Sequence, residues 1–216
     1  PPVAAAFTWL LENEQKAPLP RLVGTLPLCS TWDMQRTAGR LLNEVATSND
    51  LSTLKAAAQH ESHGVRAAVI PALCRLHNDE ELKAVYKHLG DPAPEVRLAT
   101  AWALANRGDR RALPVLVQLL DAESVDVRRG SFMVLVPLTG KHFGYPVFAE
   151  LRESETARGQ WKKWLEEESE NALLTFPVKD HYRLRATLAL AHKARSAEEI
   201  DFAETLRSIA PQLEEL

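Results

Sequence analysis

The chain has 216 residues, of which 45% are hydrophobic and 25% charged, and its formal net charge is −3. This composition is typical of a folded domain and excludes an intrinsically disordered chain. The charge excludes the overall basic field that most nucleic-acid-binding proteins present, and no apolar run approaches the roughly 18 residues that cross a bilayer. We therefore expect a soluble, folded protein with no segment inserted in a membrane, and nucleic acid is a disfavoured partner.

The first 50 residues predict an N-terminal cap and one degenerate helix pair. Residues 3–13 are mostly apolar and indicate a capping helix, and the proline-containing segment 16–20 separates it from the next element. The chain starts with Pro1 and Pro2 rather than with methionine. This start leaves open that an upstream tag, signal peptide or domain has been removed.

The middle of the chain repeats with a period of 31 residues. The same residue types recur 31 positions apart at Val65, Val96 and Val127, at Arg66, Arg97 and Arg128, and at Leu73, Leu104 and Leu135. The segments before each Val-Arg pair show the same 31-residue spacing, at Leu51, Leu82 and Leu113, and at Leu54, Val85 and Leu116. We call each set of residues 31 apart a column and each period a unit. Several columns in register identify residues 51–140 as regular repeats.

Each unit predicts two antiparallel helices. Apolar residues recur at i, i+3 and i+7 in the first segment, as at Leu82, Val85 and Leu89, and a denser apolar face follows the Val-Arg pair. Breaker residues separate the segments, and no two-residue alternation predicts a strand. Because a helix pair this short cannot bury its apolar face alone, we expect an all-α fold, an α-solenoid of about five to six antiparallel helix pairs with capping helices.

The units resemble the HEAT-like repeats first described in phycobilisome lyases. The resemblance rests on a Val-Arg pair followed by an alanine-rich helix and a short polar turn, over residues 65–79 and again over 96–109. It extends to residues 20–50, where Met34 and Gln35 stand in the Val-Arg columns. It implies a solenoid and a habit of binding other macromolecules, and it implies no particular reaction.

Residues 141–216 predict a degenerate C-terminal repeat and cap. The 31-residue step breaks at 141–146, and the helix that follows carries Trp161 and Trp164, an arrangement similar to the closing unit of many bacterial HEAT-like proteins. We expect these aromatics to close the end of the core, and two last helices near 181–195 and 197–213. Together with residues 1–50 and 51–140, this segment forms one predicted domain over residues 1–216.

The two cysteines, Cys29 and Cys74, fall at opposite ends of the expected stack. They are therefore farther apart than the Cα separation of about 5.5 Å in a disulfide. We expect two free thiols, which favours a reducing compartment. A cytoplasmic location is thus favoured, and a periplasmic one stays open if a signal peptide preceded Pro1.

Three arginines in one column, Arg66, Arg97 and Arg128, form a ladder along one edge of the expected stack. One interpretation is a row of anion-binding sites. The interpretation that we favour is structural: each arginine pairs with acidic side chains and carbonyls of adjacent turns. Asp91 and Asp121 are the expected acidic partners.

The sequence offers no convincing set of catalytic or metal-binding residues. His60 and His63 flank Glu61 in an expected turn, but a metal site needs three or four ligands. No Ser-His-Asp or Cys-His arrangement and no glycine-rich phosphate loop is evident. We expect no metal, no cofactor and no catalytic residue.

The concave face of the expected solenoid carries an unusual apolar strip. In a HEAT-like unit the positions two and six residues after the valine usually face the groove and are polar. Here Leu98, Trp102 and Met133 occupy such positions. Exposed apolar surface of this kind usually marks a binding site, and Trp, Met and Arg are enriched at interfaces. The predicted partner-binding residues are Leu98, Trp102, Met133, Arg129, Arg40, Arg36 and Arg75. Alternatively, the terminal helices or strong curvature cover the strip.

The leading hypothesis is a non-enzymatic binding module or scaffold that holds a protein or peptide partner on the concave face. One alternative is an enzyme acting on nucleic acid, similar to the HEAT-repeat DNA glycosylases, with a stacking platform at Trp102. Its thin basic track would consist of Arg36, Arg40, Arg75 and Arg129. A chromophore-lyase-like role is a third hypothesis, which rests on the repeat resemblance alone. The identity of the partner and the oligomeric state stay open.

Overall fold

The computed structural model describes residues 19–28, 32–76 and 82–175. Within these ranges every regular element is a helix, so this part of the chain is all-α, as the sequence predicts. None of the described helices is long and apolar enough to cross a membrane. The capping helix expected at residues 3–13, Cys29 and the two helices expected after residue 180 lie outside the described residues.

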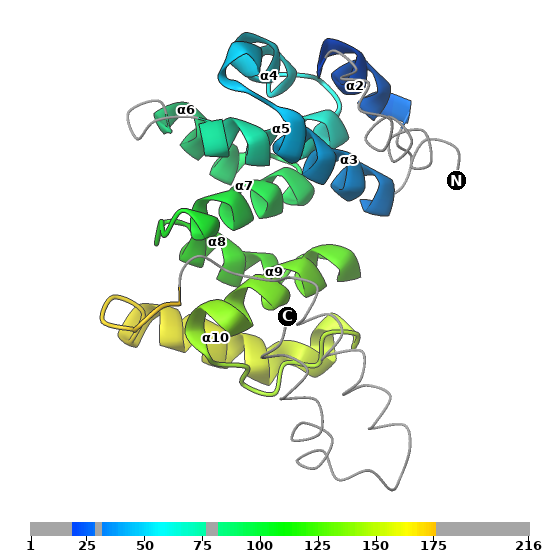
Figure 1. The fold of residues 1–216 in the computed structure, drawn as a ribbon. Coiled ribbons are helices and arrows are strands. Elements are labelled where there is room, and N and C mark those ends of the chain that lie inside the picture. The colour runs from blue at the N-terminus through cyan, green and yellow to red at the C-terminus, as the bar shows by residue number, and fades with distance from the viewer. Residues whose placement is uncertain (1–18, 29–31, 77–81, 176–216) are drawn as a thin grey trace, which may run out of the picture.

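Four successive helix pairs can be followed in the described ranges (Figure 1). The first helices of the pairs are α2 (Leu19–Thr25), α4 (Leu51–Ala57), α6 (Lys83–Tyr86) and α8 (Ala112–Leu119). The second helices are α3 (Trp32–Val45), α5 (His63–Leu76), α7 (Pro94–Asn106) and α9 (Val125–Thr139). Helix α10 (Glu155–Glu167) follows at the far end. The expected total of five to six pairs includes segments beyond these ranges and stays a prediction.

Short 3-10 helices connect several of these elements, namely η1 (Leu26–Leu28), η2 (Ser48–Asp50), η3 (Lys87–Gly90) and η4 (Leu151–Ser154). The second helices lie side by side, because α3 contacts α5, α5 contacts α7, and α7 contacts α9. They therefore form one continuous layer, and the first helices pack on one side of it.

The residues at the start of α7 and at both ends of α9 suit helix termini. Helix α7 starts with Pro94, whose fixed φ suits the first helical turn, and Glu95 places a negative charge at the helix N-terminus. Before α9, Ser124 Oγ accepts a hydrogen bond from Val127 N at 3.4 Å. Gly140 ends α9 in the left-handed conformation, with a φ of 68°.

The core lies between the two layers of helices. Val65, Val96 and Val127 are buried at equivalent places, which confirms the 31-residue register. The leucine column at 73, 104 and 135 is buried beside them, and the first helices contribute a buried column of their own at Leu54, Val85 and Leu116. Each helix pair thus completes the core of the next pair.

Two tryptophans of α10 close the described core at its C-terminal end. Trp161 and Trp164 are buried, and their rings meet edge to face with centroids 5.7 Å apart. The ring of Phe143 lies edge to face against Trp161 at 4.9 Å. The expectation that these aromatics pack into the core is therefore confirmed.

Arg110 attaches the segment that follows α10 to the rest of the stack. Its guanidinium donates to the carbonyl oxygens of Ser169 at 2.8 Å and Ala172 at 2.7 Å. Farther along, Thr175 N donates to Leu138 O near the end of α9, at 2.9 Å. Residues 169–175 therefore run back across α8 and α9.

Candidate partner-binding face

One side of the second-helix layer points away from the first helices, and we call it the inner face. Helix α7 contacts α5 on one flank, α9 on the other, and α8 and η3 behind. Four of its partly exposed residues recur at steps of four, three and four, namely Glu95, Ala99, Trp102 and Asn106. This spacing places them on one side of the helix. They therefore mark the inner face on α7.

Trp102 is the large apolar residue on the inner face of α7. Its side chain is half-buried and packs against the core. Its carbonyl accepts a hydrogen bond from Asn106 Nδ2 at 3.1 Å. The same column contains Arg40, which is exposed, and Pro71, which is half-buried. Trp102 therefore lies within a regular helix and keeps part of its aromatic ring exposed.

The prediction that Leu98 lies on an exposed strip is wrong. Leu98 is buried, and it points toward α9, where Gly130 leaves room for it. A Cβ added to Gly130 would lie 2.5 Å from Leu98 Cδ2. Leu98 thus fills a gap between two second helices. In α7 the residue of the inner face is the third after the valine, Ala99, rather than the second.

Met133 also departs from the predicted strip. It lies in the column of Trp102, but only 4% of it is exposed. Of the three apolar residues expected to be exposed on this face, only Trp102 is partly exposed in the described structure. Pro71, which precedes it in the same column, is partly exposed as well. The alternative that terminal helices cover the strip concerns residues outside the described ranges.

The arginines expected around the strip have partners within the chain. Arg129 forms an ion pair with Asp126 at 2.7 Å, and Arg40 lies 4.0 Å from Glu44. Arg75 donates to Ala46 O at 2.6 Å and to Asn43 Oδ1 at 3.3 Å. The side chain of Arg36 lies outside the described residues. Arg129 and Arg75 thus make close contacts within the chain, whereas Arg40 is exposed and its ion pair with Glu44 is long.

The three ladder arginines make the same contact in each unit. Nη1 of each donates to the carbonyls six and five residues earlier: Arg66 to His60 and Glu61 at 2.9 and 2.7 Å, Arg97 to Asp91 and Pro92 at 2.8 and 3.2 Å, and Arg128 to Ala122 and Glu123 at 2.8 and 2.7 Å. Each arginine thereby holds the turn that precedes its own helix. This geometry supports the structural interpretation of the ladder.

Asp91 adds an acidic partner in one unit. Arg66 donates from Nε and Nη2 to the two carboxylate oxygens of Asp91, at 2.9 and 2.8 Å. Asp91 also accepts from Ala93 N at 2.9 Å. Burial would raise the pKa of Asp91, but the hydrogen bonds from Arg66 and Ala93 outweigh it and hold the pKa below its usual value. This two-point contact joins α5 to the turn before α7.

The expected pairing of the ladder with Asp121 is wrong. Asp121 lies in the column of Gly90, one position before the column of Asp91, and its carboxylate binds Arg158 and, at 2.8 Å, Lys162 of α10. Ala122 occupies the column of Asp91. In the described structure Nε of Arg97 is accordingly buried with no hydrogen-bond partner.

A second use of arginine was not predicted. Arg75 donates to Ala46 O, just after α3, and Arg107 Nη1 donates to Cys74 O near the end of α5 at 2.9 Å. Carbonyls at helix C-termini lack partners within the helix, so these contacts satisfy them. Arg75 and Arg107 are 32 residues apart rather than 31, so they do not share a column.

His60 and Cys74 both have structural surroundings. His60 Nδ1 accepts a hydrogen bond from Ser62 N at 3.0 Å, the role that Asp91 plays 31 residues later. Burial raises the pKa of the Cys74 thiol to about 11, so it stays protonated near neutral pH. Among the described residues, no three His, Cys, Asp or Glu side chains gather closely enough to hold a metal ion.

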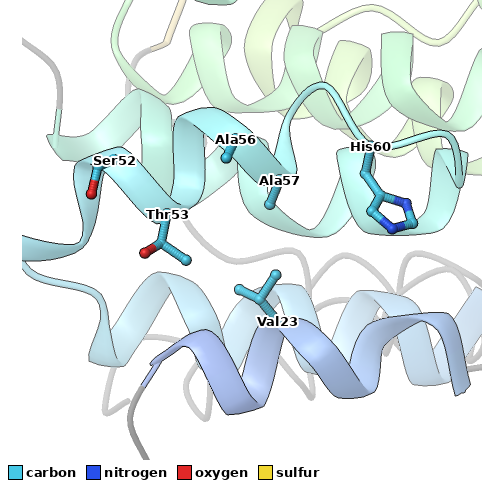
Figure 2. Close-up of a pocket in the computed structure, with 6 residues that line it drawn as sticks. All are labelled: Val23, Ser52, Thr53, Ala56, Ala57 and His60. Atoms are coloured by element: carbon cyan, nitrogen blue, oxygen red, sulfur yellow. The ribbon is translucent and has the colours of Figure 1, made fainter.

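A shallow groove lies between the first helices α2 and α4 (Figure 2). Val23 of α2 faces α4 across it, and the other lining residues are Ser52, Thr53, Ala56, Ala57 and His60. These side chains are mostly small. The groove belongs to the layer of first helices and is separate from the inner face.

Residues 51–136 match the family model for HEAT repeats. The matched stretch runs from the start of α4 into α9, which are the pairs that carry the regular columns. The match supports HEAT-like repeats in the centre of the chain and does not distinguish the phycobilisome-lyase type. A comparison with curated proteins found no match.

Proposed function

We propose that this protein is a non-enzymatic binding module or scaffold that holds a protein or peptide partner on its inner face. The observation that carries the proposal is Trp102, a large aromatic side chain that is half-buried on the inner face of α7. Tryptophan and arginine dominate the binding energy of many protein interfaces. Arg40 and Arg75, both exposed, lie in inner-face columns on α3 and α5.

A protein or peptide fits these residues better than a nucleic acid does. Binding to the phosphate backbone depends on several cationic side chains that face the ligand together. Here Arg129 pairs with Asp126, and Arg75 reaches back to Ala46 O. The inner face of α7 itself contributes Glu95, which would repel phosphate. This mixture of charges around a half-buried aromatic is typical of protein interfaces.

The test first locates and identifies the partner. A photo-crosslinking amino acid is introduced at Arg40 on the inner face, or at the exposed Gln118 of α8 as a control on the layer of first helices. The proposal expects a partner that is captured from position 40 and not from position 118. That partner is then purified, and its Kd is measured by calorimetry with wild-type protein and variants.

Trp102→Ala should weaken the binding of this partner by at least about tenfold, as truncation of an interface tryptophan commonly does. Gln118→Ala should leave Kd unchanged, and thermal melting checks that both variants are folded. Arg40→Glu provides a second test, since it alters the same column at an exposed position. An unchanged Kd in a folded Trp102→Ala protein, or capture only from position 118, would overturn the proposal.

A further inference from the structure

A buried histidine lies at the joint between the second and third helix pairs. His88 belongs to η3 and is 5% exposed. Its column contains Ala57 before it and Leu119 after it, and both are buried. A titratable ring therefore occupies a place where the neighbouring units put an apolar side chain.

The surroundings of His88 favour the neutral ring. Its Nε2 is buried with no hydrogen-bond partner in the described structure, and its Nδ1 lies 3.9 Å from Asp91 Oδ2. That carboxylate is already held by Arg66 of α5. The other charged groups at this joint are Lys87, next to His88 in η3, and Arg97 of α7, which donates to Asp91 O. The charges that act on the ring are those of the cations Lys87 and Arg66 and of the carboxylate of Asp91, which is already paired with Arg66.

We propose that the joint between the α4–α5 and α6–α7 pairs is a pH-sensitive hinge, and that protonation of His88 loosens it. A charged imidazolium would carry a buried N–H at Nε2 with no acceptor, which is costly. It can be accommodated if the ring leaves its site or if Asp91 turns from Arg66 toward it. Either movement weakens the contact that joins α5 to the turn before α7. The hinge does not depend on the proposed function of the inner face.

The direction of the pH dependence follows from the sign of the shift. Burial, and then the charge of Lys87, lower the pKa of His88, and Asp91 offsets this only in part. The unfolded chain takes up its proton near the ordinary value of 6.5. The unfolded or opened state therefore binds more protons below this pH, so the stability of the joint is complete above pH 6.5 and falls as the pH drops below it.

Hydrogen exchange measured by mass spectrometry at about pH 7.5 and about pH 5.5, on either side of the usual histidine pKa of about 6.5, tests the hinge. After correction for intrinsic rates, peptides from α5, η3 and α7 should lose protection at the lower pH in the wild-type protein. His88→Leu, which copies Leu119, should abolish this loss. His88→Gln, polar but not titratable in this range, should do the same and serves if the leucine variant does not fold.

The matched control is His63→Ala, which removes an exposed histidine from α5 and keeps His88. It should lose protection as the wild type does. The proposal is overturned if the wild-type protein shows no loss, or if His88→Leu or His88→Gln shows the same loss. An NMR titration of the wild-type His88 ring needs no variant, and a midpoint at or above 6.5 in the folded protein would overturn it as well.

Discussion

At the scale of single residues, the arginine column shows how a repeat consensus serves structure. Each Nη1 satisfies two carbonyls of the turn before its helix, which have few other partners. Whether Nε and Nη2 of the guanidinium also find hydrogen-bond acceptors depends on the residue that the next unit supplies. Arg66 binds Asp91, whereas in the next unit Ala122 stands in the column of Asp91 and Arg97 keeps a buried Nε without a hydrogen-bond partner. The residue 25 positions after the arginine thus decides whether its Nε has a hydrogen-bond acceptor.

Ala122→Asp should stabilise the protein by supplying the missing acceptor for Arg97. Because both side chains are partly exposed, we expect a gain of about 1 kcal/mol in the free energy of unfolding, measured with urea. An aspartate just before α9 also interacts favourably with the helix dipole. The same substitution in an Arg97→Gln background separates the two effects. An equal gain in that background would show that the introduced carboxylate does not pair with Arg97.

At the scale of elements, glycines set how closely the second helices approach. A Cβ on Gly39 of α3 would lie 3.0 Å from Ala68 O and 3.1 Å from Ala68 Cα of α5. These are backbone atoms, which cannot turn aside as a side chain can. Gly130 of α9 plays a similar part against Leu98 of α7. Glycine inside a helix costs about 1 kcal/mol relative to alanine, and close packing between neighbouring helices compensates for that cost here.

Gly39→Ala and Gly159→Ala should change stability in opposite directions. Gly159 lies in α10 with nothing within 4 Å of an added Cβ, so alanine should raise the free energy of unfolding by up to about 1 kcal/mol. At Gly39 the same gain in propensity is outweighed by overpacking against α5, which typically costs about 1–3 kcal/mol. Urea unfolding of the two variants measures both effects. A stabilised Gly39→Ala protein would mean that α3 and α5 separate easily.

At the scale of the whole molecule, two carboxylates, one buried and one partly exposed, connect successive parts of the stack. Asp91 joins α5 to the turn before α7, and Asp121 joins the end of α8 to α10 through Arg158 and Lys162. For Asp121, burial would raise the pKa, but the hydrogen bonds from Lys162 and Arg158 outweigh it and lower the pKa. The pKa of Asp91 is lowered in the same way. Protonation of these two carboxylates at low pH should therefore weaken the contacts that they make.

Acid unfolding should reveal these contacts between units. A carboxylate with a lowered pKa in the folded state contributes stability that is complete above the unfolded value of 3.8 and is lost as the pH falls toward the folded value. Urea unfolding between about pH 5 and about pH 3, a range that spans this unfolded value, should show falling stability. Asp91→Asn should be less stable at about pH 5 and show a shallower decline. An unchanged slope would mean that Asp91 contributes little in the native protein.

Much of the fold could be read from the sequence because contacts in a repeat protein are local. The 31-residue columns predict the helix pairs, the buried valines at 65, 96 and 127, and the edge on which the arginine ladder lies. Each of these features depends on a helix and its immediate neighbours, which the period itself describes. Trp102 was found for the same reason, since it stands where a unit usually places a polar residue.

The tertiary structure alone decided which of the flanking residues stay accessible. Positions two and three after the valine differ by about 100° around a helix axis. Whether Leu98 is open or buried therefore depends on Gly130 in the next unit, whose missing side chain makes room for it. The missing acceptor of Arg97 and the contact between Arg75 and Ala46 likewise depend on single residues of other units. Periodicity specifies the direction of a side chain, but burial depends on the residue that the adjoining helix places opposite it.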